Sequence, residues 1–419
     1  MAEPSVRAGD KIDHVVVLMM ENHSFDHLLG YHPSVGTLLE APRSLPDPTR
    51  PTEPLQIQTW QWNQFSISPC PAHDHRDVMR QLYGAADPWE SSGQWAAPSM
   101  DGFLLDYLPE HGADPRLLMG CFAPQQLPAL SLLAKTFTVC SRWFCSVPGP
   151  TGPNRLFANC ASSGGYAGTD YTAPSLSRLG ISCIPSTFLR IEETRGLTWK
   201  VYHECPEFYS EGGLAVVQAN RSANVVDPFF NEFCCDARHG RLPSYSFLTP
   251  SLPHSQHDSW DARTGDHLIA LVYNTLLGSD AWERTLLVIT YDEHGGHYDH
   301  VPPPREYLNT RTGKVVRVEN PDGAMWNTAR WGAQANPEFD FTLLGPRVPA
   351  LVISAHTPAA VDDTVYEHAS IPATLNELWG FAPLTRRDAV ANSLLRNVTA
   401  TPRPRDSLPF APIVAIPKR

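Results

Sequence analysis

Two adjacent carboxylates, Asp292 and Glu293, stand at the end of a predicted strand and are well suited to binding a cation. They follow the apolar run 286–290, which is rich in β-branched residues and short enough to be a buried strand. Gly295 and Gly296 come shortly after and allow the backbone to approach its neighbours closely. Carboxylates at the carboxyl end of a strand suit a hard cation held by oxygen ligands, although an isolated Asp-Glu pair is more often a solvated turn.

A second set of oxygen ligands follows another predicted strand, near the amino end of the chain. This strand covers residues 14–20, and Glu21 and Asn22 come directly after it. Two strands far apart in the sequence can lie side by side in a mainly parallel sheet. We therefore expect Glu21 and Asn22 to meet Asp292 and Glu293 and to bind one divalent cation.

A turn rich in proline and glycine, residues 146–155, supplies a hydroxyl. Pro153 suits the first turn of a helix that runs to about Cys160. Thr151 would then stand just ahead of a helix N-terminus, where N–H groups favour a phosphate and the hydroxyl can attack it. The alternative is that Thr151 only caps the helix, and the local sequence by itself favours that alternative.

Histidines are the candidate acids and bases of the chain. His75 lies in the polar cluster 73–77, and His254 and His257 lie in a loop after the predicted strand 244–248. Loops at strand ends carry chemistry in α/β folds. A histidine beside two acids is nevertheless more often a surface residue than a catalyst.

Strands and helices alternate between these motifs. The helix predicted over 266–277 lies between two predicted strands, which indicates a parallel crossover and an α/β fold. We expect a single domain over residues 1–399 and a Pro-rich tail at 400–419. Further segments are expected as strands at 136–139, 199–203 and 348–354, as helices at 24–29 and up to residue 379, and as insertions at about 37–71, 165–245 and 302–340.

Composition narrows the class of protein. The chain has 419 residues, of which 42 % are hydrophobic and 18 % charged, so it can bury a substantial core. Its net charge of −12 disfavours a nucleic-acid partner. The sequence predicts no transmembrane segment and no signal peptide, hence a soluble and cytoplasmic protein, or a secreted one if a leader has been removed. Nine cysteines without paired spacing indicate neither a disulfide framework nor a cysteine zinc site.

Three stretches, 21–27, 146–155 and 290–296, together resemble the phosphoesterase family of bacterial and plant non-specific phospholipases C and related acid phosphatases. The resemblance spans about residues 11–388. It implies an alkaline-phosphatase-like fold, a three-layer α/β/α sandwich with a mainly parallel central sheet. It also implies a metal-assisted attack on phosphorus by the hydroxyl of Thr151.

The same resemblance implies roles for single residues. One or more divalent cations would be bound, and oxygen ligands favour magnesium, calcium or manganese, while nearby histidines leave zinc open. His75 and His254 are the candidates to stabilise charge or to protonate the leaving oxygen. The implied metal ligands are Glu21, Asn22, Asp292, Glu293 and Thr151, and the implied substrate contacts are Asn154, His257 and His294. His297 stands where the family usually has an aromatic residue.

The resemblance favours a phospholipase C that releases diacylglycerol and a phosphorylated head group. The alternatives are a phosphomonoesterase acting on small soluble phosphates and a non-catalytic protein that binds a phosphorylated ligand. A phospholipase needs an apolar rim for transient contact with a membrane surface. The tryptophans at positions 60, 62, 89 and 95 are the candidates for such a rim, although tryptophan more often packs in a core.

Overall fold

A computed structural model describes most of the chain. The residues described are 11–33, 35, 43–45, 55–57, 60–86, 88, 94–111, 115–168, 177, 180–204, 214–226, 229–321 and 339–414. Trp89 lies outside these ranges, as do residues 37–42, 46–54 and 58–59 of the expected insertion at 37–71.

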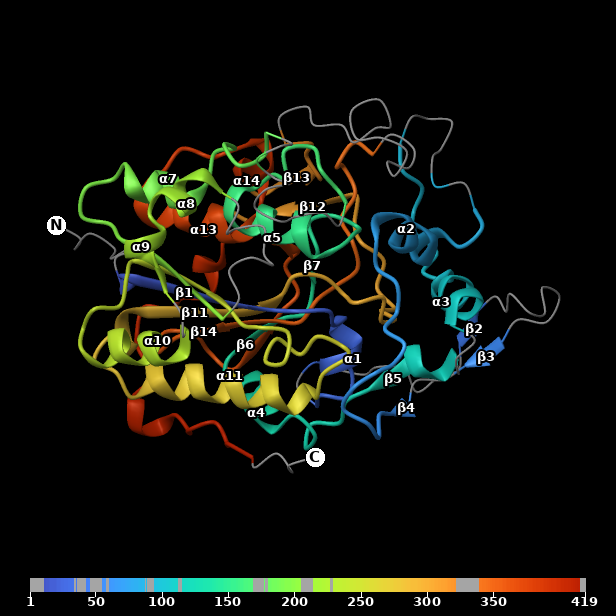
Figure 1. Cartoon of the computed structure of the whole chain (residues 1–419), viewed down its shortest axis with the longest axis horizontal. Helices are drawn as coiled ribbons and strands as arrows, with labels where there is room; N and C mark the ends of the chain where they lie inside the picture. Colours follow the sequence, from blue (N-terminus) through green and yellow to red (C-terminus); the bar gives the residue numbers. More distant parts are fainter. Residues whose placement is uncertain are drawn as a thin grey trace.

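An eight-stranded sheet runs through the middle of the molecule (Figure 1). Its strand order is β15 (Ala360–Asp362), β6 (Thr138–Cys140), β14 (Ala350–Ile353), β11 (Thr285–Tyr291), β1 (His14–Met20), β10 (Tyr245–Thr249), β8 (Trp199–His203) and β9 (Val225–Val226). β14 runs antiparallel to both of its neighbours, and the other pairings are parallel. The apolar side chains of β1 and β11 are buried along the whole of each strand, as expected for central strands covered on both faces.

Helices cover both faces of this sheet, which confirms the predicted three-layer α/β/α sandwich (Figure 1). One layer contains α4 (Pro128–Thr136), α10 (Phe229–Arg238) and α11 (Ala262–Leu277). The other contains α5 (Thr151–Cys160), α7 (Thr187–Glu192), α8 (Ala215–Ala219), α9 (Arg221–Asn224), α13 (Ser370–Trp379) and α14 (Arg386–Val390). The amphipathic pattern of α11 buries Leu268, Ile269, Val272 and Leu276 against the sheet and its neighbouring helices.

Shorter elements gather beyond one end of the sheet, on the right in Figure 1. There α2 (His75–Tyr83) packs on α3 (Phe103–His111), and a second apolar core forms beneath them. The remaining elements are α1 (Phe25–Leu29), β2 (Arg43–Leu45), β3 (Leu55–Ile57), β4 (Trp60–Gln61), β5 (Gly120–Cys121), β7 (Trp143–Phe144), β12 (Glu306–Asn309), β13 (Lys314–Arg317), β16 (Tyr366–Glu367) and the 3₁₀ helices η2 (Pro115–Met119), η4 (Trp282–Arg284), η5 (Leu394–Asn397) and η6 (Arg405–Ser407).

Several element boundaries differ from the prediction. α11 begins at Ala262 rather than 266, because the Asp261 side chain accepts a hydrogen bond from Arg263 N and caps the helix there. α5 begins at Thr151, two residues before Pro153. The stretch 165–245, expected as an insertion, contributes β8 and β9 to the central sheet.

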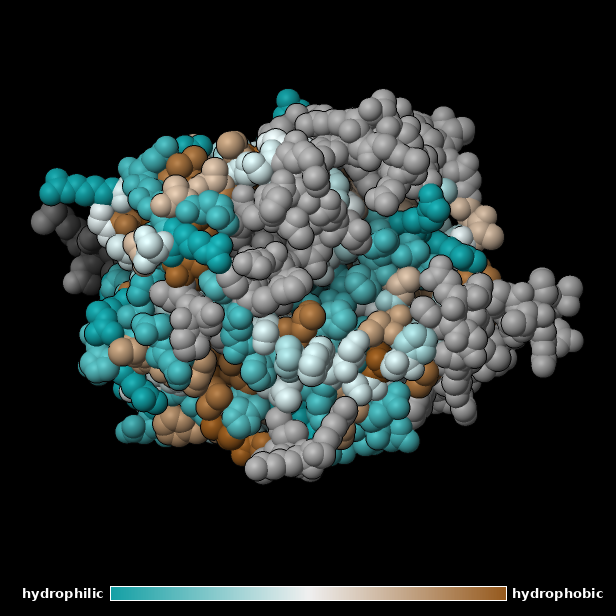
Figure 2. Space-filling view, in the orientation of Figure 1, coloured by the Kyte–Doolittle hydropathy of each residue, from teal (hydrophilic) through white to brown (hydrophobic). Residues whose placement is uncertain are grey.

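The described part of the C-terminal tail lies along α11. Tyr273 Oη donates to the carbonyl of Pro409, and Asn274 exchanges two hydrogen bonds with the backbone of Ala411. Figure 2 shows that hydrophilic residues cover much of the described surface on this face, with apolar residues in smaller patches. Among the described helices, none has the length and apolar character needed to cross a membrane.

Candidate functional site

The parallel pairing of β1 and β11 brings the two acid-bearing strand ends together. Met20 is in register with Tyr291, so Glu21 and Asp292 leave the sheet at the same edge. Beyond the strands the two chains stay paired, because Asp292 N donates to Met20 O and His23 N donates to Glu293 O. Asn22 N also lies 3.3 Å from Asp292 Oδ1. The four predicted oxygen ligands therefore come from two adjoining loops.

A close backbone approach fixes these loops. Gly295 has a φ of +64°, and a Cβ built on it would lie only 2.2 Å from the carbonyl oxygen of Asn22. Asn22 itself adopts a left-handed conformation, with φ of 62°, which asparagine tolerates better than most residues. The glycine is therefore required for the turn after Glu293 to lie against the loop after β1.

Arg155 joins the acids to the helix that carries Thr151. Its Nε lies 3.2 Å from Asp292 Oδ2, and one terminal nitrogen lies 3.4 Å from Glu21 Oε1. The same nitrogen donates to Met19 O, so the guanidinium is held against the ends of both loops. Sequence reasoning gave Arg155 no role, although its position four residues after Thr151 places both side chains on one face of α5.

The oxygen atoms of this site fit a hard cation. Asn22 Oδ1 and Glu293 Oε1 are buried and have no hydrogen-bond partner within the part of the chain that the structure describes. Burial raises the pKa of Asp292 well above its usual range, against the opposing effect of Arg155. Unpartnered buried oxygens and closely spaced carboxylates are costly unless a cation compensates them. Glu21, Asn22, Asp292 and Glu293 thus form a donor set that suits a divalent ion.

Thr151 is the first residue of α5, and its side chain is almost buried at 6 % exposure. The capping position belongs to Pro150, and no side-chain hydrogen bond caps the helix. The alternative in which Thr151 only caps the helix is therefore not supported. Thr151 and Arg155 are one turn apart, so their side chains lie on the same face of α5.

Asn154, expected to contact substrate, holds the turn that carries Thr151. Its Oδ1 accepts from Val147 N at 3.0 Å. Its Nδ2 lies 3.1 Å from each of three carbonyl oxygens, those of Val147, Gly149 and Pro150. Both polar ends of the side chain therefore contact the backbone of the turn.

His75 packs beneath the same turn and is buried. Its Nδ1 lies 2.6 Å from the carbonyl oxygen of Pro148, so this nitrogen carries the hydrogen. Burial lowers the pKa of His75 to about 4, against a smaller opposite effect of that hydrogen bond. A ring that is neutral at pH 7 does not suit the expected role of proton donor.

His254 and His257 lie in the loop between β10 and α11, next to the acid site. Ser255 O in this loop accepts from Glu21 N at 2.9 Å. His254 is about half exposed, and its Nδ1 lies 2.8 Å from Glu204 Oε2. This hydrogen bond to Glu204 raises the pKa of His254. His257 is half-buried, and its Nδ1 has no partner among the described residues.

Two further histidines flank Glu293. His294 is fully buried, and its Nε2 lies 2.7 Å from Gln81 Oε1. His73, which sequence reasoning did not single out, lies with its Nε2 3.7 Å from Glu293 Oε1 and 3.4 Å from Asn22 Nδ2. Burial is the largest single effect on the pKa of His73 and lowers it, but Glu293, the hydrogen bond to Pro71 O, Asp258 and Asp74 together raise the pKa to about 9. A protonated His73 thus compensates part of the negative charge of the acid site.

Comparisons with known proteins give the family to which this chain is similar. The chain matches the phosphoesterase family over residues 12–382. It is 33 % identical to Non-specific phospholipase C3 of Arabidopsis thaliana over 433 residues, which cover 96 % of this chain and 76 % of that protein. It is 29 % identical to Phospholipase C A of Mycobacterium tuberculosis over 454 residues, which cover 97 % of this chain and 81 % of that protein. Among solved structures, it is similar to a protein in the alkaline phosphatase superfamily from Vibrio parahaemolyticus, with 13 % identity, a TM-score of 0.38 and coverage of 64 % of this chain and 63 % of that chain.

Proposed function

Because this chain belongs to the phosphoesterase family and is a phosphoric ester hydrolase, we propose that it is a phospholipase C whose nucleophile is Thr151. The position of Thr151 carries this proposal. It is the first residue of α5, one turn before the arginine that contacts Glu21 and Asp292. In the described part of the chain no hydrogen bond caps α5 through this side chain, so the hydroxyl is not committed to a capping role.

The helix provides a place for the substrate phosphate. The first N–H groups of α5 have no partners within the helix and, together with the helix dipole, favour an anion beside Thr151. As the Thr151 oxygen bonds to phosphorus, its proton passes to water. The bond between phosphorus and the glycerol oxygen breaks, and the glycerol oxygen takes up a proton. Water then attacks the phosphorylated threonine, which releases the phosphorylated head group and restores the hydroxyl.

Glu21, Asn22, Asp292 and Glu293 would hold a divalent cation beside this hydroxyl. Such a cation lowers the pKa of a hydroxyl that it contacts and compensates the charge of the phosphate. Arg155 keeps the carboxylates of Glu21 and Asp292 oriented towards one another, since it contacts both. A family assignment and a set of buried oxygens favour magnesium, calcium or manganese over softer metals.

We assign proton donation to His254 rather than to His75. The glycerol oxygen leaves as an alkoxide unless a proton reaches it, and an acid must carry that proton near neutral pH. Glu204 raises the pKa of His254, whereas burial lowers that of His75 to about 4. Its Nδ1–H bond to Pro148 O lets His75 support the turn that carries Thr151.

Two exposed apolar side chains favour a lipid substrate over a small soluble phosphate. Leu252 and Trp260 are 39 % and 44 % exposed, and both belong to the loop that carries His254. Apolar side chains on a loop beside the site suit contact with a lipid surface. Of the four tryptophans expected to form a rim, Trp62 and Trp95 are buried at 1 % and 5 % exposure, so these two do not contribute to it.

The nucleophile can be tested with Thr151→Val and Thr151→Ser. We expect Thr151→Val to lose turnover by on the order of 10⁴ in kcat, the usual scale for a lost nucleophile. Thr151→Ser should retain appreciable activity, because the attacking oxygen remains. Activity should be measured on phosphatidylcholine, p-nitrophenyl phosphorylcholine and p-nitrophenyl phosphate, and Thr275→Val, at a buried threonine of α11, serves as a matched control.

Each outcome bears on one part of the proposal. A folded Thr151→Val protein with near-normal kcat would show that another group attacks phosphorus. A wild-type preference for p-nitrophenyl phosphate over both diesters would favour the phosphomonoesterase alternative. Equal and undetectable turnover of all three compounds by the wild type would favour a protein that only binds phosphorylated ligands.

A further inference from the structure

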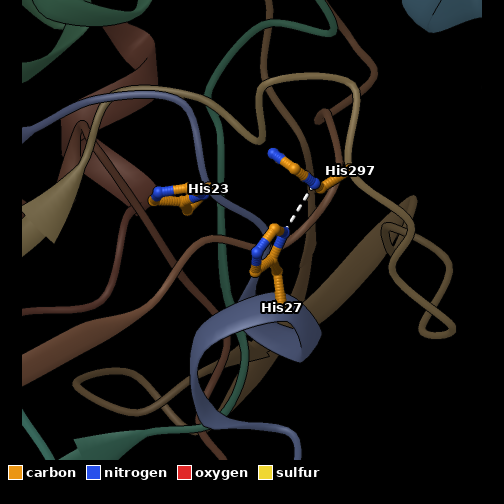
Figure 3. Close-up of side chains that lie close together, drawn as sticks. All are labelled: His23, His27 and His297. Carbon is orange, nitrogen blue, oxygen red and sulfur yellow. Dashed lines mark hydrogen bonds between the residues drawn. The ribbon is translucent and has the colours of Figure 1, made fainter. Parts of the chain in front are cut away.

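Three histidines from separate segments form a buried group beside the acid site (Figure 3). His23 follows β1, His27 lies in α1, and His297 follows the glycine turn after β11. A ring nitrogen of each lies within 4.8 Å of the others. Figure 3 shows the ring of His27 directed from α1 towards His297, with His23 beside them. We refer to these three residues as the histidine cluster.

Several ring nitrogens of the cluster have no hydrogen-bond partner among the described residues. Both ring nitrogens of His23 and Nε2 of His27 are buried and have no hydrogen-bond partner among the described residues. A neutral histidine ring carries one nitrogen with a free lone pair, and this is the form that binds a metal.

Asp258 orients one of these rings. Its Oδ1 lies 2.6 Å from His297 Nε2, so that nitrogen carries the hydrogen and Nδ1 presents its lone pair. The lone pair of His297 Nδ1 faces Nδ1 of His27 at 2.5 Å. A carboxylate that holds the outer nitrogen of a histidine is a common arrangement around bound zinc. Asp258 Oδ2 is also buried and unpartnered.

A neighbouring group of two acids and a histidine already has its negative charge compensated by the protein. Asp26, Asp299 and His300 also bring ligand atoms close together. There, however, Arg347 lies 2.7 Å from Asp26 Oδ1 and 2.8 Å from Asp299 Oδ1 and supplies the positive charge. No arginine or lysine contacts the histidine cluster in the residues that the structure describes.

We propose that His23, His27 and His297 bind a Zn²⁺ ion, with Asp258 orienting His297. Imidazole nitrogens bind Zn²⁺ at about 2.0–2.1 Å, so two of them on a tetrahedral ion lie roughly 3.3 Å apart. The close pair His27 and His297 must open by less than about 1 Å, and the ion then replaces their hydrogen bond. A small cavity of about 10 Å³, lined by His23, His27 and Asp258 among others, adjoins the cluster.

A zinc ion here would fasten the loops that carry the acid site. His23 comes directly after Asn22, and His297 follows the turn that begins at Glu293. One ion would thus link the loop after β1 to the loop after β11, separately from the cation that the acids bind. It would act on the structure of the loops, so its removal should loosen them even when no substrate is present.

Zinc titration in the presence of excess Mg²⁺ tests this proposal, because Mg²⁺ fills an oxygen site and avoids a site made of imidazoles. We expect the wild type to take up one Zn²⁺ per chain, measured by calorimetry and by elemental analysis after dialysis, and its Tm to rise. His297→Phe should lose this uptake. His32→Phe should keep this uptake. His32 is also a buried histidine, but it lies outside the cluster and bonds to Ser131 O.

Two further measurements make the result decisive. Co²⁺ in place of Zn²⁺ should give the visible absorption of a tetrahedral nitrogen site in the wild type and in His32→Phe, but not in His297→Phe. His23→Gln repeats the test if His297→Phe does not fold, as judged by circular dichroism. The proposal is overturned if the wild type takes up no Zn²⁺, or if the folded cluster variants take up as much as the wild type.

Discussion

Replacement of Asn154 by leucine distinguishes a residue that holds the turn from one that contacts substrate. Leucine has nearly the same shape but no polar atoms, so the variant loses the contacts to the backbone of Val147, Gly149 and Pro150. Nδ2 has two hydrogens for its three acceptors, so these contacts amount to three full hydrogen bonds. At about 1 kcal/mol for each bond, the free energy of unfolding should fall by about 3 kcal/mol. The loss should be visible as a lower denaturant midpoint.

Asn159 offers a matched control on the same helix. It is also fully buried, but its side chain makes two hydrogen bonds, to Arg155 O and Tyr245 Oη. Asn159→Leu should therefore cost about 2 kcal/mol, about 1 kcal/mol less than Asn154→Leu. Both variants are measured by urea unfolding and by kcat and KM on p-nitrophenyl phosphorylcholine.

The kinetic constants give a second, independent distinction. If Asn154 holds the turn, the remaining folded Asn154→Leu protein should lose kcat, because Thr151 is no longer fixed against the acids. Our reasoning is refuted if Asn154→Leu is no less stable than Asn159→Leu and shows only a raised KM. That result would restore the interpretation of Asn154 as a substrate contact.

Two further predictions concern the loop between β10 and α11. Trp260→Ser should raise KM for phosphatidylcholine vesicles several-fold and leave KM for p-nitrophenyl phosphorylcholine unchanged. Val315→Ser, at an exposed residue of β13, serves as control. Equal effects on both substrates would argue against a lipid-contacting loop. Glu204→Gln should lower the pKa of His254, because the hydrogen bond to Glu204 raises it. In the pH profile of kcat for substrates with poor leaving groups, the high-pH limb should then move to lower pH. An unchanged limb would exclude His254 as the acid.

The central strands could be predicted because their environment leaves a plain mark on the sequence. β1 and β11 are covered on both faces, so they appear as unbroken apolar runs, and the polar residues that end them lie at one sheet edge. The observed strands cover 14–20 and 285–291, close to the predicted ranges. The convergence of Glu21 with Asp292 followed from topology alone, since neighbouring parallel strands end together.

Other features depend on contacts that no local pattern reveals. The early start of α11 rests on a cap from Asp261, and a buried Trp62 or Trp95 looks the same in the sequence as an exposed one. β8 was predicted as a strand, but its place in the central sheet depends on pairing with β10. In this pairing Trp199 lies opposite Tyr245, which is 46 residues later in the sequence. Tertiary pairing of this kind decides the structure of residues 165–245 more than their local sequence pattern does.

The turn at Thr151 shows that a motif can predict the position of a residue without fixing its role. Asn154 was predicted to contact substrate because it belongs to the motif that carries the hydroxyl, and in the structure its side chain bonds to the backbone of the turn. Arg155 belongs to the same motif and was missed, because its partners lie more than 130 residues away in either direction. The motif thus predicted that these residues lie near Thr151. Their chemical roles depend on which of their polar atoms already bond to other parts of the protein.

The supply of positive charge distinguishes three buried polar groups along this part of the molecule. Arg347 contacts both Asp26 and Asp299, so that group is complete without an ion. Arg155 contacts Glu21 and Asp292, and His73 lies 3.7 Å from Glu293 Oε1. Asn22 Oδ1 and Glu293 Oε1 still have no hydrogen-bond partner among the described residues, so the acid site is only partly compensated.

The histidine cluster lies at the other extreme, because no basic side chain reaches it in the described residues, and both nitrogens of His23 and Nε2 of His27 have no hydrogen-bond partner there. Buried polar atoms are rarely left without partners in a folded protein, since each costs about 1–3 kcal/mol. The number of unpartnered atoms therefore orders these sites by their need for a bound ion. On this argument the Arg347 group should bind none, the acid site should bind a hard cation, and the histidine cluster should bind zinc.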